Sequence, residues 1–210
     1  MSSHHGPITD LEHPDDKQFG VASPGKIGMW LFLGTDAMSF SGLLIAYAVL
    51  RGAKPWPDPV EALGGVELSA FMTFILICSS VSMVLSIDAC KMGDRNKMLK
   101  WLKMTIIGGV IFLGIQVYEY QHLILDLGLT LAPWTYNGEV YSHFGSTFFA
   151  ITGFHGLHVL TGVIYLIVMY GLAKNGRFDN ANYNQLEIAG LFWHFVDLVW
   201  ILVFTFIYLL

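Results

Sequence analysis

The hydrophobic positions of this chain gather into five long runs separated by short polar links. A hydrocarbon core of about 30 Å needs roughly 20 helical residues, and each run reaches that length. We therefore predict an all-α protein, a polytopic membrane bundle of five transmembrane helices. The helices are expected at about 26–50, 67–90, 99–125, 143–172 and 187–210, with a tail over 1–25 and one membrane domain over 26–210.

The links between the runs are rich in residues that form turns. RGAKPWPDPVEALGG and DLGLTLAPWTYNGEVY are dense in Gly, Pro, Asn and Asp. Composition agrees with membrane burial, because only 13% of the residues are charged, whereas soluble proteins carry about a quarter. A soluble bundle of buried helices is the competing interpretation, and five nearly continuous apolar runs disfavour it.

Basic residues are unevenly divided between the two sides of the predicted bundle. One side has only Arg51 and Lys54, so the positive-inside rule predicts a cytoplasmic N-terminus and an external C-terminus. The tail lacks the pattern of a removable signal peptide. The net charge of -5, with no basic stripe, argues against nucleic-acid binding. The basic residues assigned to the cytoplasmic side are Lys17, Lys26, Lys91, Arg95, Lys97, Lys100, Lys103, Lys174 and Arg177.

Ionisable residues occur within the apolar runs, where each costs several kcal/mol unless it is paired or faces protein. One interpretation is structural, since such groups link helices where water is absent. The other is a proton-handling or ion-handling route, which needs groups at graded depths. The sequence leaves both open. The residues concerned are Asp36, Glu119, His122, His155, His158, His194 and Asp197.

Histidines in the fourth run raise the question of a metal site. His155 and His158 have i, i+3 spacing and share a helix face. A haem or copper site needs several histidines at one level, whereas we expect His122 near the outer surface and His194 nearer the inner one. We therefore favour no metal in this chain. The tail positions His4, His5 and His13 are interpreted as solvated or derived from expression.

The depths of three polar residues coincide. Asp36 lies about ten residues into the first run, roughly 15 Å from its inner end, and the fourth run passes in the opposite direction. His155 and His158 then lie roughly 18 to 22 Å from the outer end. We predict that Asp36 meets one of these histidines near the bilayer midplane; bonding to residues of the same helix is the alternative.

Small and aromatic residues indicate packing more than chemistry. Glycines and serines in the runs allow close helix approach. Cys78 and Cys90 are about 18 Å apart along one predicted helix and cannot pair. The tryptophans are interpreted partly as interfacial anchors, with acyl-chain contact as the alternative, at Trp30, Trp101, Trp193 and Trp200.

Five strings, in order, carry a family resemblance that runs from about Lys26 to the C-terminus. They are LFLGTDAMSFSGLLIAYAVLR, GDRNKMLKWL, YEYQHLI, FGSTFFAITGFHGLHVLTG and FWHFVDLVWILVFTFIYLL. The chain resembles subunit III of the haem-copper oxidases. The resemblance implies a subunit without haem, copper or chemistry of its own, packed mainly on catalytic subunit I, with subunit II and other subunits nearby.

The same resemblance implies a multi-pass protein of a bacterial-type inner membrane and a role in aerobic respiration. Haem and copper are expected in the partner subunits. Subunit III of this family sustains proton uptake into subunit I, protects the complex during turnover, and holds phospholipid in a cleft. Those properties are therefore expectations for this chain.

Two departures bear on the type of oxidase. Many members have two further leading helices, which this chain lacks, and a glutamate where Asp36 stands. Five helices with an aspartate resemble the subunit III of quinol oxidases, whereas FGSTFFAITGFHGLHV resembles cytochrome c oxidases, which we favour. A nitric oxide reductase accessory protein and a stand-alone transporter remain as alternatives; two related halves, typical of transporters, are not detectable.

Overall fold

A computed structural model describes residues 23–178 and 183–210. In this part of the chain five helices are long and apolar enough to cross a membrane, which confirms the predicted all-α bundle. They are α1 (Pro24–Ala53), α3 (Glu67–Lys91), α4 (Arg95–Leu125), α5 (Phe144–Lys174) and α6 (Asn184–Val203), the last continued by the π-helix η1 (Phe204–Leu209). Most of the tail, including His4, His5 and His13, lies outside the described residues.

Local sequence signals explain where several helices begin. Ser23 caps α1, with proline at the first helical position. Asp94 caps α4 by accepting the amide of Lys97 at 3.0 Å. Gly93, with φ of 72°, makes the tight turn between α3 and α4. Because these caps lie outside the apolar runs, α1 starts at Pro24 and α4 at Arg95, earlier than hydrophobicity alone indicates.

The link after α4 contains a β-hairpin that hydrophobicity does not reveal. Strands β1 (Trp134–Tyr136) and β2 (Glu139–Tyr141) pair antiparallel, with Trp134 opposite Tyr141. Asn137 and Gly138 connect them at φ of 50° and 84°. Two successive positive φ values suit a two-residue hairpin turn. A short helix, α2 (Pro59–Ala62), lies in the link after α1, capped by Asp58.

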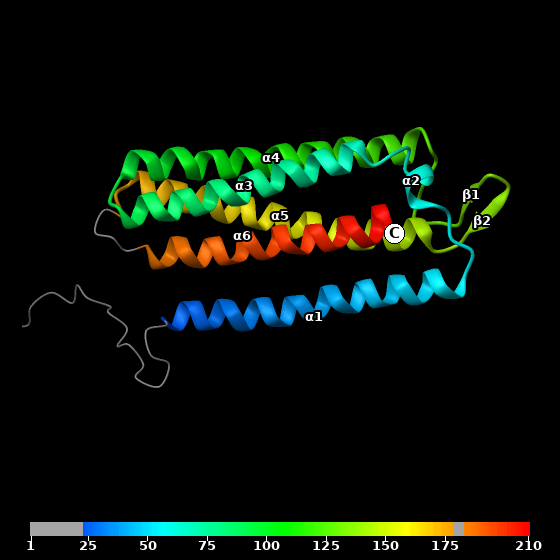
Figure 1. Cartoon of the computed structure of the whole chain (residues 1–210), viewed down its shortest axis with the longest axis horizontal. Coiled ribbons are helices and arrows are strands. Elements are labelled where there is room, and N and C mark those ends of the chain that lie inside the picture. The colour runs from blue at the N-terminus through cyan, green and yellow to red at the C-terminus, as the bar shows by residue number, and fades with distance from the viewer. Residues whose placement is uncertain (1–22, 179–182) are drawn as a thin grey trace, which may run out of the picture.

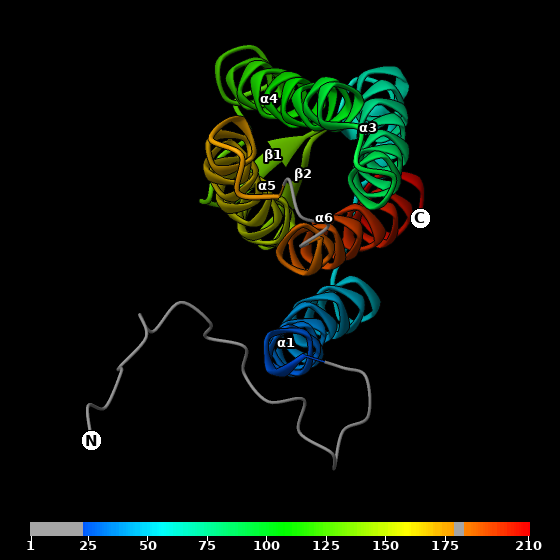
Figure 2. The same cartoon turned by 90° about the vertical axis from the view of Figure 1, so that its left-hand side faces the viewer.

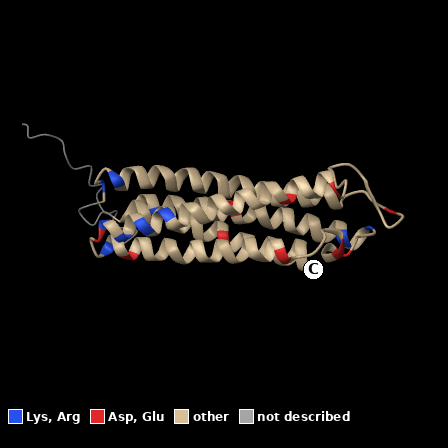
Figure 3. Cartoon of the chain, turned by 90° about the horizontal axis from the view of Figure 1, so that it is seen from above, with Lys and Arg blue, Asp and Glu red and all other residues tan. Residues whose placement is uncertain are grey.

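The helices are arranged as a four-helix bundle with one additional helix (Figures 1 and 2). Viewed along the bundle, α3, α4, α5 and α6 form a ring, and α1 lies outside it against α6 and part of α5. We call the end where α1, α4 and α6 begin the basic end, and the other the hairpin end. Lysine and arginine gather at the basic end (Figure 3).

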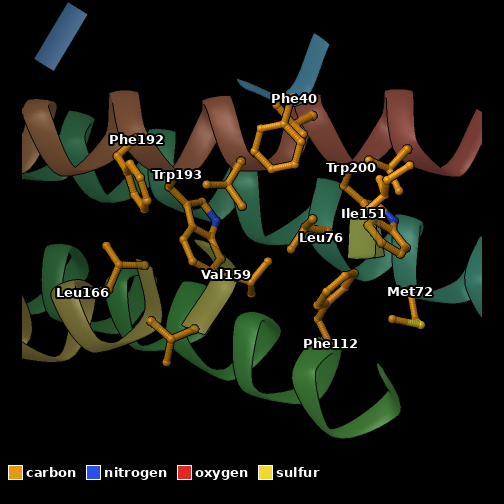
Figure 4. Close-up of a cluster of buried hydrophobic side chains, with 14 of the residues drawn as sticks. Phe40, Met72, Leu76, Phe112, Ile151, Val159, Leu166, Phe192, Trp193 and Trp200 are labelled. Carbon is orange, nitrogen blue, oxygen red and sulfur yellow. The ribbon is translucent and has the colours of Figure 1, made fainter. Parts of the chain in front are cut away.

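The interior of the ring is filled by large apolar side chains (Figure 4). Trp193 and Trp200 of α6 point into it, and each is at most 1% exposed. Phe112 of α4 packs edge-on against Trp200, with ring centroids 4.8 Å apart. The interpretation of Trp193 and Trp200 as interfacial anchors is therefore wrong. Trp30, by contrast, is 63% exposed.

Hydroxyl groups accept hydrogen bonds from the indole N–H groups of the two buried tryptophans. Trp193 donates its indole N–H to Ser79 Oγ at 3.1 Å, and Trp200 donates to Thr73 Oγ1 at 2.9 Å. Small residues bring the backbones close enough for this packing. A Cβ on Gly109 would lie 2.6 Å from atoms of both Trp193 and Val163. Glycine at 109 is therefore required by the tryptophan that fills the core.

Candidate functional site

Asp36 of α1 and His158 of α5 meet near the middle of the bundle. His158 Nε2 lies 3.1 Å from Asp36 Oδ1, and His158 Nδ1 lies 2.8 Å from the carbonyl oxygen of Phe154. A carbonyl only accepts hydrogen bonds, so Nδ1 carries a proton and donates it. The contact with Asp36 then holds one further proton, either on the carboxyl or on Nε2. The pair is neutral overall in both states.

Apolar rings surround this pair. The ring centroid of Phe40 lies 5.2 Å from that of His158, and the centroid of Phe154 lies 4.7 Å away. Asp36 is 8% exposed, and its second oxygen, Oδ2, is buried without a hydrogen-bond partner. An isolated charge is costly in such surroundings, and a pair without net charge reduces that cost. The contact therefore joins α1 to the ring without burying net charge.

His155 lies one turn away and does not contact Asp36. Its Nε2 lies 3.1 Å from the carbonyl oxygen of Val196 on α6, so Nε2 carries the proton. Its Nδ1 is buried without a partner, and the side chain is 0% exposed. Trp200 and Phe112 lie against the imidazole of His155, with their ring centroids 4.9 and 5.7 Å from its centroid. Of the two histidines proposed for Asp36, the structure brings only His158 to it.

Glu119 joins α4 to the C-terminal π-helix. The hydroxyl of Tyr208 donates to Glu119 Oε2 at 3.0 Å, although 89 residues separate the two. Tyr208 lies in η1, where Leu210 N bonds to Thr205 O at 3.1 Å in the i→i+5 pattern. Both side chains are buried. This contact anchors the end of the chain to α4 toward the hairpin end.

A second polar network links α4 to α5 one turn from Glu119. Gln116 donates to the backbone oxygen of Thr152 at 2.9 Å, and the Tyr120 hydroxyl lies 2.7 Å from Thr152 Oγ1. Gly156 leaves space for this amide, since a Cβ there would lie 2.7 Å from Gln116 Oε1. These side chains satisfy one another's hydrogen bonds, as buried polar groups require.

One side of α6 carries titratable residues from the basic end inward. At the end, Lys26 and Lys91 both pair with Glu187, the second at 2.6 Å. Seven residues further, His194 Nδ1 lies 2.6 Å from Ser80 Oγ of α3. Asp197 follows, 8% exposed, with Oδ1 buried and unpartnered. Glu187, His194 and Asp197 therefore lie at successive depths.

His122 differs from the other candidates because it lies at the hairpin end and is exposed. Its Nδ1 is 2.6 Å from Asp126 Oδ2, one turn further along α4. Across residues 23–178 and 183–210, no three His, Cys, Asp or Glu side chains converge as a metal site would require. The histidines instead contact separate partners at different levels.

Several partners of these residues were not identified from the sequence. Ser80, Tyr208 and Glu187 come from elements far along the chain from what they contact. For Glu187 the sequence did contain a signal, because His194 follows it by seven residues and therefore lies on the same helix face. For Tyr208 the sequence contained no such signal, because the π-helix changes the side of the element on which Tyr208 lies.

The fold and these contacts define a multi-span membrane subunit in which buried polar groups join helices. The family model for cytochrome c oxidase subunit III matches residues 11–210. The chain belongs to this family. It is therefore subunit III of a haem-copper oxidase, of the cytochrome c or the quinol type, in a respiratory complex with other oxidase subunits.

Curated relatives of both types match most of the chain. Cytochrome c oxidase subunit 3 of Synechocystis sp. is 36% identical over 209 residues, covering 99% of this chain and 78% of the relative. The same subunit of Alkalihalophilus pseudofirmus is 32% identical and covers 88% and 85%. Cytochrome bo(3) ubiquinol oxidase subunit 3 of Pseudomonas putida is 36% identical and covers 88% and 84%. Identity at this level does not separate the two electron donors.

Proposed function

We propose that this chain stabilises catalytic subunit I of a cytochrome c oxidase and supports proton uptake during oxygen reduction. Family membership supports its assembly with other subunits. The observation that carries the proton-uptake role is the line of Glu187, His194 and Asp197 on α6. Relative to Glu187, the two deeper residues lie about 10 and 15 Å further along the axis. Graded titratable groups are what a proton-collecting surface needs.

The basic end is proposed to face the cytoplasm. Its cations include Lys26 and Lys91, which share Glu187, and Lys97, which pairs with Asp94. Arg51 lies at the other end, in the last turn of α1. This asymmetry supports a cytoplasmic N-terminus and an external C-terminus in a bacterial-type inner membrane. The titratable line of α6 then opens to the side from which protons are taken.

Subunit I is the proposed main partner, with subunit II and other oxidase subunits beside it. Haem and copper are assigned to those partners, and membrane phospholipid to the surface of this chain. Chemical catalysis is assigned to the partner subunits, as the family resemblance implies. The buried polar residues described above position helices and, on α6, exchange protons.

The proton-uptake role is tested by replacing Asp197 with asparagine in the intact oxidase. Asparagine keeps the shape and removes the titratable carboxyl group, so we expect slower proton uptake at neutral pH with unchanged haem content. Asp126→Asn is the matched control, because Asp126 is an exposed carboxyl at the opposite end. Uptake kinetics that are identical in all three complexes would reject the role.

The stabilising role needs a separate measurement. A complex purified without this chain is expected to retain haem and copper but to lose activity after fewer turnovers. An unchanged number of turnovers before inactivation would contradict it. This measurement does not depend on Asp197, so the stabilising role and the proton-uptake role can each fail without the other.

A quinol oxidase is the second candidate, favoured by the Pseudomonas putida relative. The cytochrome c assignment rests on the likeness of FGSTFFAITGFHGLHV to cytochrome c oxidases. Oxygen consumption by the purified complex decides the donor. We expect activity with reduced cytochrome c; activity with a quinol alone would assign the chain to the second candidate.

A further inference from the structure

An apolar groove lies on the outer side of α3 and α4. It is open to the surface, has a volume of about 410 Å³, and extends from Trp101 to Ile111 on α4 and from Leu85 to Phe74 on α3. Ten helical residues span about 15 Å, which gives the length of the groove. Cys78 and Gly108 lie midway, where small side chains leave the groove open. Its rims are exposed apolar residues, so nothing in the described chain covers it.

Two lysines stand where this groove reaches the basic end. Lys100 is one helical turn before Met104, which lines the groove, and therefore lies on the same side of α4. Its ammonium is 5.9 Å from the centre of the Trp101 ring. Lys103 lies at the edge of the same side. Both are exposed and, among the residues described, neither takes part in an ion pair. Lys97, by contrast, pairs with Asp94 at 2.9 Å.

The depth of Lys103 indicates what these cations meet. It is eight residues into α4, about 12 Å from the helix start, and the whole helix is about 46 Å long. Centred on a hydrocarbon core of about 30 Å, the helix extends about 8 Å beyond it at each end. Lys103 therefore starts just inside the hydrocarbon, and its long side chain reaches the headgroup level. An anion at that level would pair with Lys103 and Lys100 together.

We propose that this groove binds one acyl chain of an anionic phospholipid, whose phosphate pairs with Lys100 and Lys103. The exposed Lys100 and Lys103 beside the groove favour a lipid with an anionic headgroup over an apolar partner helix. Trp101 lies at the boundary between headgroup and acyl chain, where such rings are favoured.

This site differs from the phospholipid cleft that the family resemblance implies. That cleft is bounded on one side by two leading helices, which would precede the five helices described above. The groove proposed here is lined by α3 and α4 alone. It is independent of the proton-uptake role, which rests on the α6 side chains.

Native mass spectrometry of the delipidated oxidase complex tests the proposal. Phosphatidylglycerol and phosphatidylcholine with identical acyl chains are titrated separately, and inorganic phosphate is titrated as a third probe. Each lysine near an anionic headgroup contributes roughly fivefold in affinity, so phosphatidylglycerol is expected to bind about thirtyfold more tightly than phosphatidylcholine. Equal affinity for the two lipids would overturn the proposal.

Amino-acid substitutions test whether the lipid binds in this groove. The pair Lys100→Gln with Lys103→Gln should abolish the preference, whereas Lys97→Gln, which removes a cation already paired with Asp94, should keep it. Cys78→Phe should weaken both lipids by filling the groove. If this variant does not assemble, the lysine variants still decide. An equal loss in Lys97→Gln would overturn the site, as would full displacement of phosphatidylglycerol by inorganic phosphate.

A cross-link distinguishes lipid from protein in the groove. Val81 lines it and is 55% exposed, so p-benzoylphenylalanine at this position reaches any occupant. In the native membrane we expect capture of phosphatidylglycerol on this chain. Capture of another oxidase subunit would replace the proposal with a helix interface.

Discussion

The helix α1 and the ring of α3 to α6 are attached by different means. In the most apolar stretch of α1, 22% of the residues are buried within the chain, compared with 50% in the span formed by α6 and η1. The ring is held by tryptophans packed on glycines, whereas α1 is held toward its middle by the Asp36–His158 contact and a few aromatic rings. Packing of matched shapes therefore secures the ring, whereas α1 is attached by polar contacts, Asp36–His158 toward its middle and Lys26–Glu187 at the basic end.

The largest effect is expected from Gly109→Leu in the ring. The added side chain overlaps Trp193 and Val163, so the subunit should lose about 3 kcal/mol or more of stability and assemble poorly. Gly114→Leu on the same helix is the matched control, because a Cβ there has no neighbour within 4 Å. Labelling of the buried thiol of Cys90 on heating the purified complex measures the difference. Equal labelling temperatures would show that Gly109 is not required.

A smaller and more local effect is expected from Asp36→Ala. His158 Nε2 loses its partner, at a cost of about 2 kcal/mol, while the ring keeps its own contacts. Hydrogen exchange should therefore rise in α1 and stay unchanged in α3 to α6. Ser41→Ala is the control, since Ser41 bonds only within α1, to Ala37 O. Uniform exchange increases across all helices would disprove the separate attachment of α1.

Tyr208→Phe tests the attachment of the π-helix to the ring. It removes the hydrogen bond to Glu119 and should cost about 1 to 2 kcal/mol. The 62% exposed Tyr118 on the same stretch of α4 provides the control Tyr118→Phe, which should change little. Limited proteolysis at the C-terminus compares the two, and equal cleavage rates would argue against the anchoring role.

The smallest effect concerns the cap of α4 outside the membrane. Hydrogen bonds from Lys97 lower the pKa of the Asp94 carboxyl, which forms this cap, below its ordinary value. A carboxyl with a lowered folded-state pKa stabilises the fold above its unfolded pKa and loses that contribution as pH falls through the folded value. Asp94→Ala should therefore lower the unfolding temperature slightly at neutral pH and hardly at all in strong acid. A difference that grows in acid would contradict this assignment.

Hydrophobic runs predicted all five spans because each must cover the same apolar thickness. Depth also predicted the level at which Asp36 meets a histidine, but not which one. His155 and His158 differ by three residues, or about 60° around the helix, and helix rotation is set by tertiary packing. Hydrophobicity could not distinguish buried Trp193 from exposed Trp30, since both suit an apolar run.

Other features could not be predicted from the order of residues along the chain, each for a different reason. The turn Asn137–Gly138 carries a recognised hairpin signal, which the breaker-rich link concealed. The π-helix at Phe204–Leu209 has no comparable signal, and it decides that Tyr208 reaches Glu119. The contact of Ser80 with His194 spans 114 residues and depends on how α3 and α6 are rotated.

The separation of Asp36 from His158 along the chain has a consequence for biosynthesis. The two residues are 122 positions apart, so at roughly 5 to 20 residues per second α1 is made about 6 to 24 s before its partner. During that interval the Asp36 side chain has no partner on α5, and an unpaired ionisable group is costly at that depth. Arrival of α5 supplies His158 as the partner, and α1, which packs mainly on α6, docks only after the last helices of the ring have been inserted.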